Sequence, residues 1–183
     1  MTGPGSKTGA CGGMAAVELV LVLPLLMALL ALAVDGGRLL ADYHAVSKSV
    51  RDAARFLARA EAVSETCVPG ALDRARPEVE RAVRLAMTGR ADGDPAAEAL
   101  VAGWRASDLS ETATGVRVAR ACLNNAGGNN AGGALAGLYD GQAAIPSVIV
   151  EARVPFRFAF ARTLGLGPAM TLTVAHKTAR TGV

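Results

Sequence analysis

One long apolar run constrains the N-terminal part of the chain more than any other feature. From Met14 to Val34 there are 21 residues, and Glu18 is the only charged residue among them. As an α-helix rising about 1.5 Å per residue, this run would be about 31 Å long. That length just spans a hydrocarbon core of about 30 Å. The run therefore predicts a single membrane-spanning helix.

The helical pattern continues beyond the end of this run. After Val34, apolar residues recur every three or four positions, which is typical of one face of an amphipathic helix. They are Leu39, Leu40, Tyr43, Val46, Val50, Ala53, Ala54 and Leu57. After Pro24, no proline interrupts the pattern before Pro69. We therefore predict one helix over 14–62, with a membrane-spanning part (14–34) and an amphipathic part (35–62). Gly36 and Gly37 mark the soft point between them.

The remaining residues, 63–183, are expected to form a head with short helices. Pro77–Thr88 predicts a helix, because proline suits its first turn and Gly89 suits its end. The apolar face of this helix is expected to hold Val79, Ala82, Val83 and Ala86. A short third helix is predicted to start at Asp94 and Pro95 and to stop at Gly103.

Three stretches of the head alternate apolar and polar residues and predict antiparallel strands. They are 115–121, 147–154 and 170–178. In the first, Val116 and Val118 are expected on one face, and Arg117 and Arg120 on the other. Asn124–Gly133, rich in Gly and Asn, predicts a loop. The predicted fold class is α+β, with a long N-terminal helix packed on a small antiparallel sheet with short helices.

Composition and side-chain placement argue against catalysis and nucleic-acid binding. The net charge of +3 is small and scattered along the chain, whereas nucleic-acid-binding domains concentrate basic residues on one face. One predicted loop is crowded with polar side chains but contains no histidine. These are Ser107, Asp108, Ser110 and Glu111. His44 and His176 fall in separate predicted elements and are expected at the surface, so no metal and no cofactor is expected. We predict that the protein is not an enzyme.

The residues just before the apolar run form a recognisable processing signal. Gly13 precedes Met14, and Glu18 is the fifth residue counted from Met14. Glycine, four residues, glutamate and then a long apolar helix is the pattern that a prepilin peptidase cuts. That enzyme cleaves on the cytoplasmic side and leaves the helix on the mature protein. Residues 1–13, rich in Gly, Ser and Thr, are therefore expected to be a leader peptide.

Three sequence segments at and after this site, with matching spacing, resemble a known family. Ala15–Leu26, Asp35–Leu40 and Ser49–Arg55 resemble the TadE-type pseudopilins, minor pilin-like proteins of tight-adherence (Flp) pilus systems. The resemblance is strong over 13–60 and returns more weakly at 147–155 and 169–180. It implies a pilin-like fold and a single pass through the cytoplasmic (inner) membrane, with the head outside the cytoplasm.

The resemblance also implies partners and residue roles. The partners would be a prepilin peptidase, other pilins or pseudopilins, and the pilus assembly platform. A charge at mid-membrane costs about 2.5–3.5 kcal/mol on insertion scales, and such residues usually pair. In this family the α-amine freed at Met14 would pair with Glu18 of a neighbouring subunit and fix the subunit register. Pro24 removes one backbone hydrogen bond. The resulting kink could help the helix pass from bilayer to filament, or could simply be tolerated in the membrane.

The cysteines suggest a covalent link within the head. Cys67 and Cys122 are the only cysteines that remain after cleavage at Gly13, and disulfides persist outside the cytoplasm. A bridge between them would join the long helix to the sheet. Closing a loop of about 55 residues is worth about 4 kcal/mol in the chain-entropy model. Two separate buried thiols remain the alternative.

Two alternatives to a pilin-like subunit stay open. The protein could be a membrane-anchored assembly or scaffold protein that never polymerises. It could also be a soluble secreted binding domain, because Ala31-Leu32-Ala33 has the small-x-small form of a signal-peptidase site. Continuous helical periodicity through Ala33 argues against this cut. One observation opposes the expected orientation: Arg38, Lys48 and Arg51 outside outnumber Lys7 inside, against the positive-inside tendency.

Overall fold

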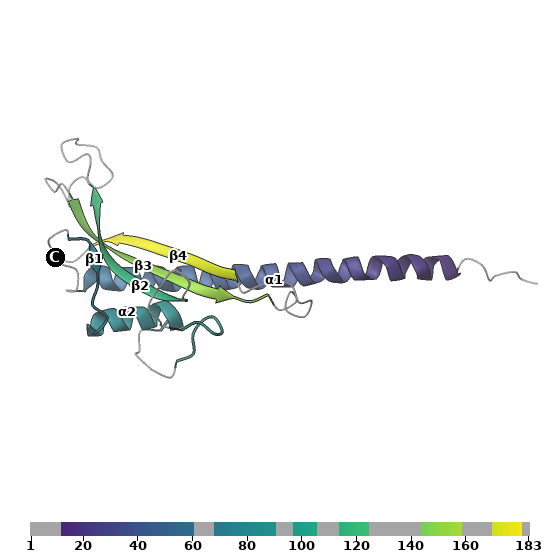
Figure 1. The fold of residues 1–183 in the computed structure, drawn as a ribbon, viewed down its shortest axis with the longest axis horizontal. Helices are drawn as coiled ribbons and strands as arrows, with labels where there is room; N and C mark the ends of the chain where they lie inside the picture. The colour runs from purple at the N-terminus through teal and green to yellow at the C-terminus, as the bar shows by residue number, and fades with distance from the viewer. Residues whose placement is uncertain are drawn as a thin grey trace, which may run out of the picture. The chain divides into compact units, whose positions relative to one another are not determined.

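The structure is a computed structural model that describes residues 12–60, 68–90, 97–105, 114–124, 144–158 and 170–180. Its elements are α1 (Gly12–Arg59), β1 (Gly70–Ala71), α2 (Pro77–Thr88), β2 (Gly115–Asn124), β3 (Ala144–Phe156) and β4 (Met170–Ala179) (Figure 1). This confirms the α+β class. The chain divides into two compact units. The N-terminal unit holds Met1–Arg38 and Phe158–Gly167, and the head unit holds Leu39–Arg157 and Pro168–Val183.

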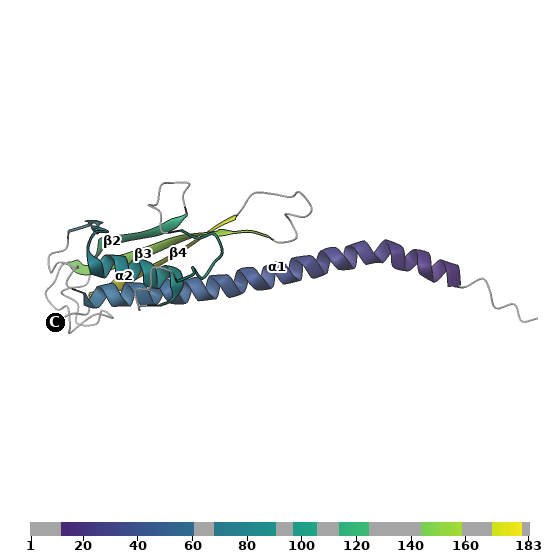
Figure 2. The same cartoon turned by 90° about the horizontal axis from the view of Figure 1, so that it is seen from below.

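Helix α1 contains 48 residues and confirms the predicted long helix, although it ends at Arg59 instead of continuing to residue 62. The Ala60 N–H donates a 3.1 Å hydrogen bond to the Leu57 carbonyl at this end. Pro24 lies inside the helix, and the first part of α1 is visibly curved (Figure 2). Proline is a usual cause of such bending because it removes one backbone donor.

In the head unit, four strands form one antiparallel sheet in the order β1-β2-β3-β4. Val118 of β2 lies opposite Val150 of β3, which in turn lies opposite His176 of β4. The three predicted strands are confirmed, and each is longer than its alternating stretch. β1 was not predicted, because two residues are too short to show a period.

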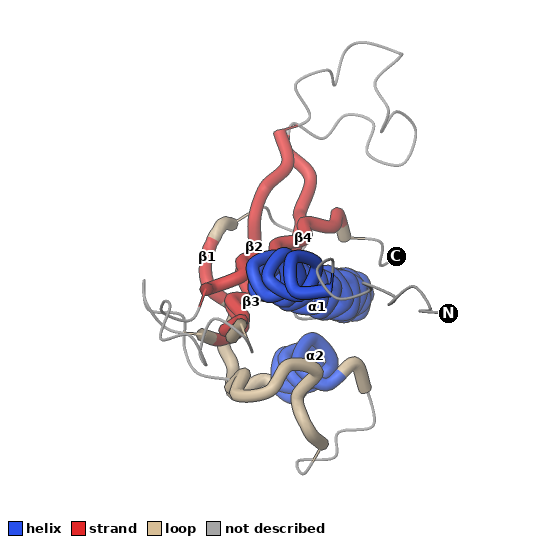
Figure 3. The backbone as a smooth tube through the Cα atoms, turned by 90° about the vertical axis from the view of Figure 1, so that its right-hand side faces the viewer, coloured by secondary structure: helices blue, strands red, loops and turns tan. Residues whose placement is uncertain are grey.

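One face of this sheet is buried beneath helices. Residues directly opposite each other in an antiparallel ladder point to the same side, and on this side the sheet buries mostly valines. They are Val116, Val118, Val148, Val150, Ala152, Val154 and Val174. The part of α1 in the head unit and α2 both lie on this side (Figure 3). Together these elements form one hydrophobic core.

Arg120 occupies the opposite face of β2 from the one expected. It is two residues from Val118, and successive residues of a strand alternate sides, so it shares the helix-facing side. Its Nε atom is buried and has no hydrogen-bond partner among the described residues. The prediction that Arg120 lies on the same face as Arg117 was therefore wrong. Even-numbered residues of β2 face the helices, and the odd-numbered Arg117 lies on the exposed face.

Helix α2 is confirmed residue for residue. Pro77 occupies its first turn, and Gly89 ends it with a positive φ of 70°. The Gly89 N–H donates to the Leu85 carbonyl over 2.9 Å, which satisfies one of the carbonyls left open at a helix end. The predicted apolar face of α2 is buried, as expected.

The described part of the predicted third helix, residues 97–103, forms bends and turns instead. Asp94 and Pro95, its predicted start, lie outside the described residues. The Leu100 N–H donates to the Met87 carbonyl over 2.8 Å, and Val101 and Trp104 are buried in the core. So short a segment gains little from helical hydrogen bonds, and its contacts with α2 and the core decide its course.

Candidate functional site

The predicted processing signal lies at the start of α1. The helix begins at Gly12, so the bond between Gly13 and Met14 falls within its first turn. Glu18 is exposed on the same helix. Glu18 follows Met14 by four residues, which is about one turn of the helix. The structure thus gives Gly13, Met14 and Glu18 a common helical setting, whereas nothing in it tests the cleavage itself.

Glu18 stands alone among apolar side chains. Ion pairs within the head include Arg84 with Glu80 and Arg153 with Glu151. None of them involves Glu18. A carboxylate in this position is open to a partner from another molecule.

The apolar side chains of α1 between Val17 and Val34 are exposed, with Leu21 reaching 74%. Of the described helices, one is long and apolar enough to cross a membrane, and none of its most apolar stretch is buried. Burying one Leu or Val side chain is worth about 1.5–3 kcal/mol. A helix that is apolar all round therefore requires cover by lipid or by other helices, which fits a single-pass anchor.

Pro24 lies within this exposed stretch, and α1 continues on both sides of it. Its ring nitrogen cannot donate to the carbonyl of Val20, four residues earlier. That carbonyl is a local weak point in the helical ladder. Whether the weak point serves assembly stays a prediction.

Cys122 lies on β2 opposite Pro146 of β3 and is disulfide-bonded. Cys122 is two residues from Arg120 on the same strand, so both residues lie on the helix-facing side of the sheet. Its predicted partner, Cys67, lies outside the described residues, so the pairing stays a prediction. The neighbouring register bears on it: Gly70 of β1 lies opposite Arg120. In the sequence, Cys67 is three residues before Gly70, and Cys122 is two residues after Arg120.

The two histidines occupy different environments. His44 is exposed on α1. His176 lies opposite Val150 and therefore on the helix-facing side of β4, where it is partly buried instead of fully at the surface as expected. Burial lowers the pKa of His176, and the charges of Arg51 and Arg55 lower that pKa further. The lowered pKa of His176 thus indicates that β4 runs beside the part of α1 that carries Arg51 and Arg55.

No group of three or more metal-binding side chains occurs in the described ranges. The polar cluster Ser107, Asp108, Ser110 and Glu111 lies outside those ranges. The absence of enzymatic activity and of cofactors therefore stays a prediction. What the described residues provide is an interaction surface, namely the exposed apolar stretch of α1 from Val17 to Val34, in which Glu18 is the only carboxylate.

Comparison with known proteins bears on the same segment. Residues 13–55 match the family model described as TadE-like protein. No curated protein and no solved structure gives a significant match to the chain. The matched residues run from the predicted cleavage site to the part of α1 that is buried in the head, and they cover less than half of the chain. Residues 13–55 are thus a TadE-like segment, as their sequence predicts.

Proposed function

We propose that this protein is a pseudopilin or minor pilin of a tight-adherence pilus assembly system. In this proposal a prepilin peptidase cleaves it after Gly13, the helix 14–34 holds it in the cytoplasmic membrane, and the head lies outside the cytoplasm. The observation that carries the proposal is the match of residues 13–55 to the TadE-like family. That segment includes the apolar, exposed stretch of α1 from Val17 to Val34, in which Glu18 is the only carboxylate.

The position of the predicted cleavage bond suits a peptidase. Proteases act on extended backbone, so a bond inside a helix must first be released. The N–H groups of the first four helical residues have no intrahelical partner. Because α1 begins at Gly12, opening the helix as far as Met14 disrupts few hydrogen bonds.

The exposed helix can serve in two environments. In the bilayer, its apolar surface is covered by lipid. In a filament, the helices of neighbouring subunits would cover the same surface. Glu18 then distinguishes the two states, because the α-amine freed at Met14 of a neighbour can pair with it. An ion pair held away from water is stronger than one at an exposed surface.

The disulfide is proposed to join Cys67 to Cys122. Cys122 is disulfide-bonded, and the pairing of Gly70 with Arg120 joins the chain three residues after Cys67 to the chain two residues before Cys122. Such a bond would join the segment after α1 to the sheet.

The two alternatives make different use of the same parts. A scaffold protein would keep the anchor and never leave the membrane. A secreted domain cut after Ala33 would lose the anchor but keep the entire hydrophobic core, whose first residue is Val46. The TadE-like match starts before Ala33 and includes the anchor, which supports the pilin-like proposal over a secreted domain.

Deletion and complementation test the proposal. Deletion of the gene should abolish or strongly reduce surface pili, and the wild-type chain should restore them. Glu18→Gln should be inserted into the membrane and processed but should fail to restore pili. The control is Arg117→Gln, a charge removal on the exposed face of β2, which should restore them.

The location of the protein separates the remaining possibilities. Presence in the sheared pilus fraction would identify a filament subunit, and restriction to the membrane fraction would identify an assembly protein. Normal pili in the deletion strain would contradict the proposed function in both forms.

A further inference from the structure

The core-facing stripe of α1 continues past the region where the head covers it. Val46 and Val50 are fully buried, whereas Tyr43 and Leu40 are 42% and 57% exposed. Tyr43 precedes Val50 by seven residues, or nearly two turns, so the two side chains share one side of the helix. At the end of the head where α1 enters it, Tyr43 on the stripe and Leu40 beside it are thus exposed, and Leu39 of the stripe is only partly buried.

The first residue of β4 adds a third bare apolar side chain at this end. Met170 is 51% exposed. β4 runs in the same direction as the head part of α1 (Figure 1), and His176 is close to Arg51 and Arg55. Six residues of strand span about 20 Å, which equals about 13 residues of helix. Met170 therefore lies at about the level of Leu40.

The same end of the sheet has an exposed positive charge. Phe156, the last residue of β3, lies opposite Met170. Arg157 follows it and is exposed. We define the entry patch as Leu40, Tyr43, Met170 and Arg157, all in the head unit.

We propose that the entry patch rests on an anionic lipid surface. The proposal depends on the membrane anchorage proposed above. Along α1, Leu40 is six residues beyond Val34, the last residue of the apolar run, which is a rise of about 9 Å. The headgroup region on each side of a bilayer is about 5–8 Å thick. The Cα–Cβ bonds of a helix tilt toward its N-terminus, so Leu40 and Tyr43 reach back toward the apolar run.

The chemistry of the patch suits this boundary. Tyrosine is enriched where a membrane meets water, because its ring is apolar and its hydroxyl is polar. A basic side chain near an anionic leaflet contributes about 1 kcal/mol of attraction. Leu40 and Tyr43 lie on the same helix as the membrane-spanning run, six and nine residues beyond Val34, which favours lipid over a second protein as the cover of the patch.

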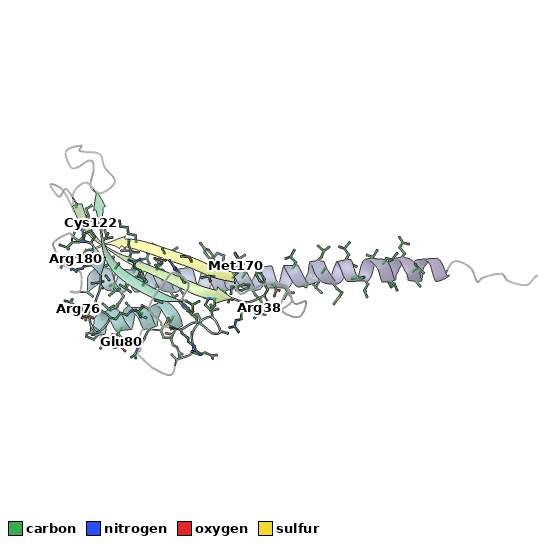
Figure 4. All side chains as sticks on the ribbon, in the orientation of Figure 1. Arg38, Arg76, Glu80, Cys122, Met170 and Arg180 are labelled. Atoms are coloured by element: carbon green, nitrogen blue, oxygen red, sulfur yellow. The ribbon has the colours of Figure 1, made fainter. Side chains whose placement is uncertain are left out.

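A matched control lies at the other end of the sheet. Val68 is 53% exposed, close to the value for Met170. Val68 lies two residues before Gly70 of β1. Gly70 is in line across the four strands with Arg120 of β2, Val148 of β3 and Thr178 of β4. Thr178 is eight residues, or about 26 Å, from Met170. Figure 4 shows Cys122, two residues beyond Arg120 on β2, and Met170 at opposite ends of the sheet.

Tryptophan quenching by brominated lipids tests the contact on the full chain in liposomes. The chain has one tryptophan, Trp104, which is buried in the head and supplies a constant background. Tyr43→Trp and Met170→Trp should lose most of their added emission to bromines placed near the headgroups. Val68→Trp should lose little. Leu26→Trp, inside the apolar run, should be quenched by bromines deep in the acyl chains.

The outcomes separate the proposal from its premise. Without quenching of Leu26→Trp, the anchorage itself is wrong. If Leu26→Trp is quenched but Tyr43→Trp and Met170→Trp behave like Val68→Trp, the lipid contact is wrong and the anchor stands. A water-soluble quencher gives a further check. If it fails to reach Tyr43→Trp and Met170→Trp only at a high protein-to-lipid ratio, a second copy of the chain covers the patch, and the proposal is overturned.

The role of charge has its own comparison. Combined with Tyr43→Trp, the substitution Arg157→Gln should reduce quenching in anionic liposomes and leave it unchanged in zwitterionic ones. Equal quenching in both lipids, with and without Arg157, would overturn the anionic specificity.

Discussion

Replacing Val50 by aspartate should unfold or severely destabilise the head. The Val50 side chain is fully buried in the core shared by α1, α2 and the sheet. Losing its burial costs about 1.5–3 kcal/mol, and placing an unpaired polar group there adds about 1–3 kcal/mol. The expected loss of about 2.5–6 kcal/mol is a large part of the roughly 5–15 kcal/mol that stabilises a typical protein.

Trp104 provides the assay, because it is buried in the same core as Val50. Urea unfolding of the detergent-solubilised chain, followed by tryptophan fluorescence, should show a much lower midpoint for Val50→Asp. Lys48→Asp is the control, since Lys48 is exposed on the same helix and should change stability by no more than about 0.5 kcal/mol. Equal midpoints for the two variants would show that the head folds without α1 and would refute the packing argument.

Three further predictions concern single contacts in the head. Ser49→Ala should cost about 1–3 kcal/mol in urea unfolding, because the buried Ser49 hydroxyl lies 2.6 Å from the Ala86 carbonyl and joins α1 to α2; an unchanged midpoint would contradict this. Gly89→Ala should cost about 1–2 kcal/mol because of its positive φ, whereas Gly70→Ala, which meets open space, should not. The lowered pKa of His176 means that protonation below about 6.5 favours the unfolded chain. Stability should therefore fall as pH decreases through that value, and His176→Gln, unlike His44→Gln, should flatten the fall in a pH series of melting temperatures.

The elements with strong local signals were predicted correctly from the sequence. α2 has proline at its start, glycine at its end and apolar residues at helical spacing between them, so its bounds follow from local chemistry. The strands were recognised by alternation, although their ends were not, because backbone pairing extends beyond the alternating residues. β1 consists of Gly70 and Ala71 and exists through its register with Arg120, which no local pattern encodes.

The wrong predictions concern residues whose conformation depends on tertiary contacts, or whose side of the sheet depends on the strict alternation of a strand. A helix was predicted from Asp94 to Gly103 because of its flanking Pro and Gly, but its described residues form bends and turns, and Val101 and the neighbouring Trp104 are buried in the core. Arg120 was assigned to the same face as Arg117, although its even-numbered position places it on the face of Val118. The partial burial of His176 depends on how β4 runs beside α1, and this cannot be derived from the sequence of β4.

The candidate site shows the same division. Gly13, Glu18 and Pro24 are consecutive features of one segment, so the sequence alone located them, and the family match covers them all. The entry patch combines α1 with the ends of β3 and β4. Its residues are far apart in the chain and come together only through the register of the sheet.

N-terminal sequencing of the mature protein from the membrane fraction tests the central claim most directly. The account predicts a chain that begins at Met14, and Gly13→Val should accumulate a longer form that retains the leader. A mature chain beginning at Val34 in the soluble fraction would contradict the account and support a secreted domain. A chain that still begins at Met1 would contradict processing and support an uncleaved membrane scaffold.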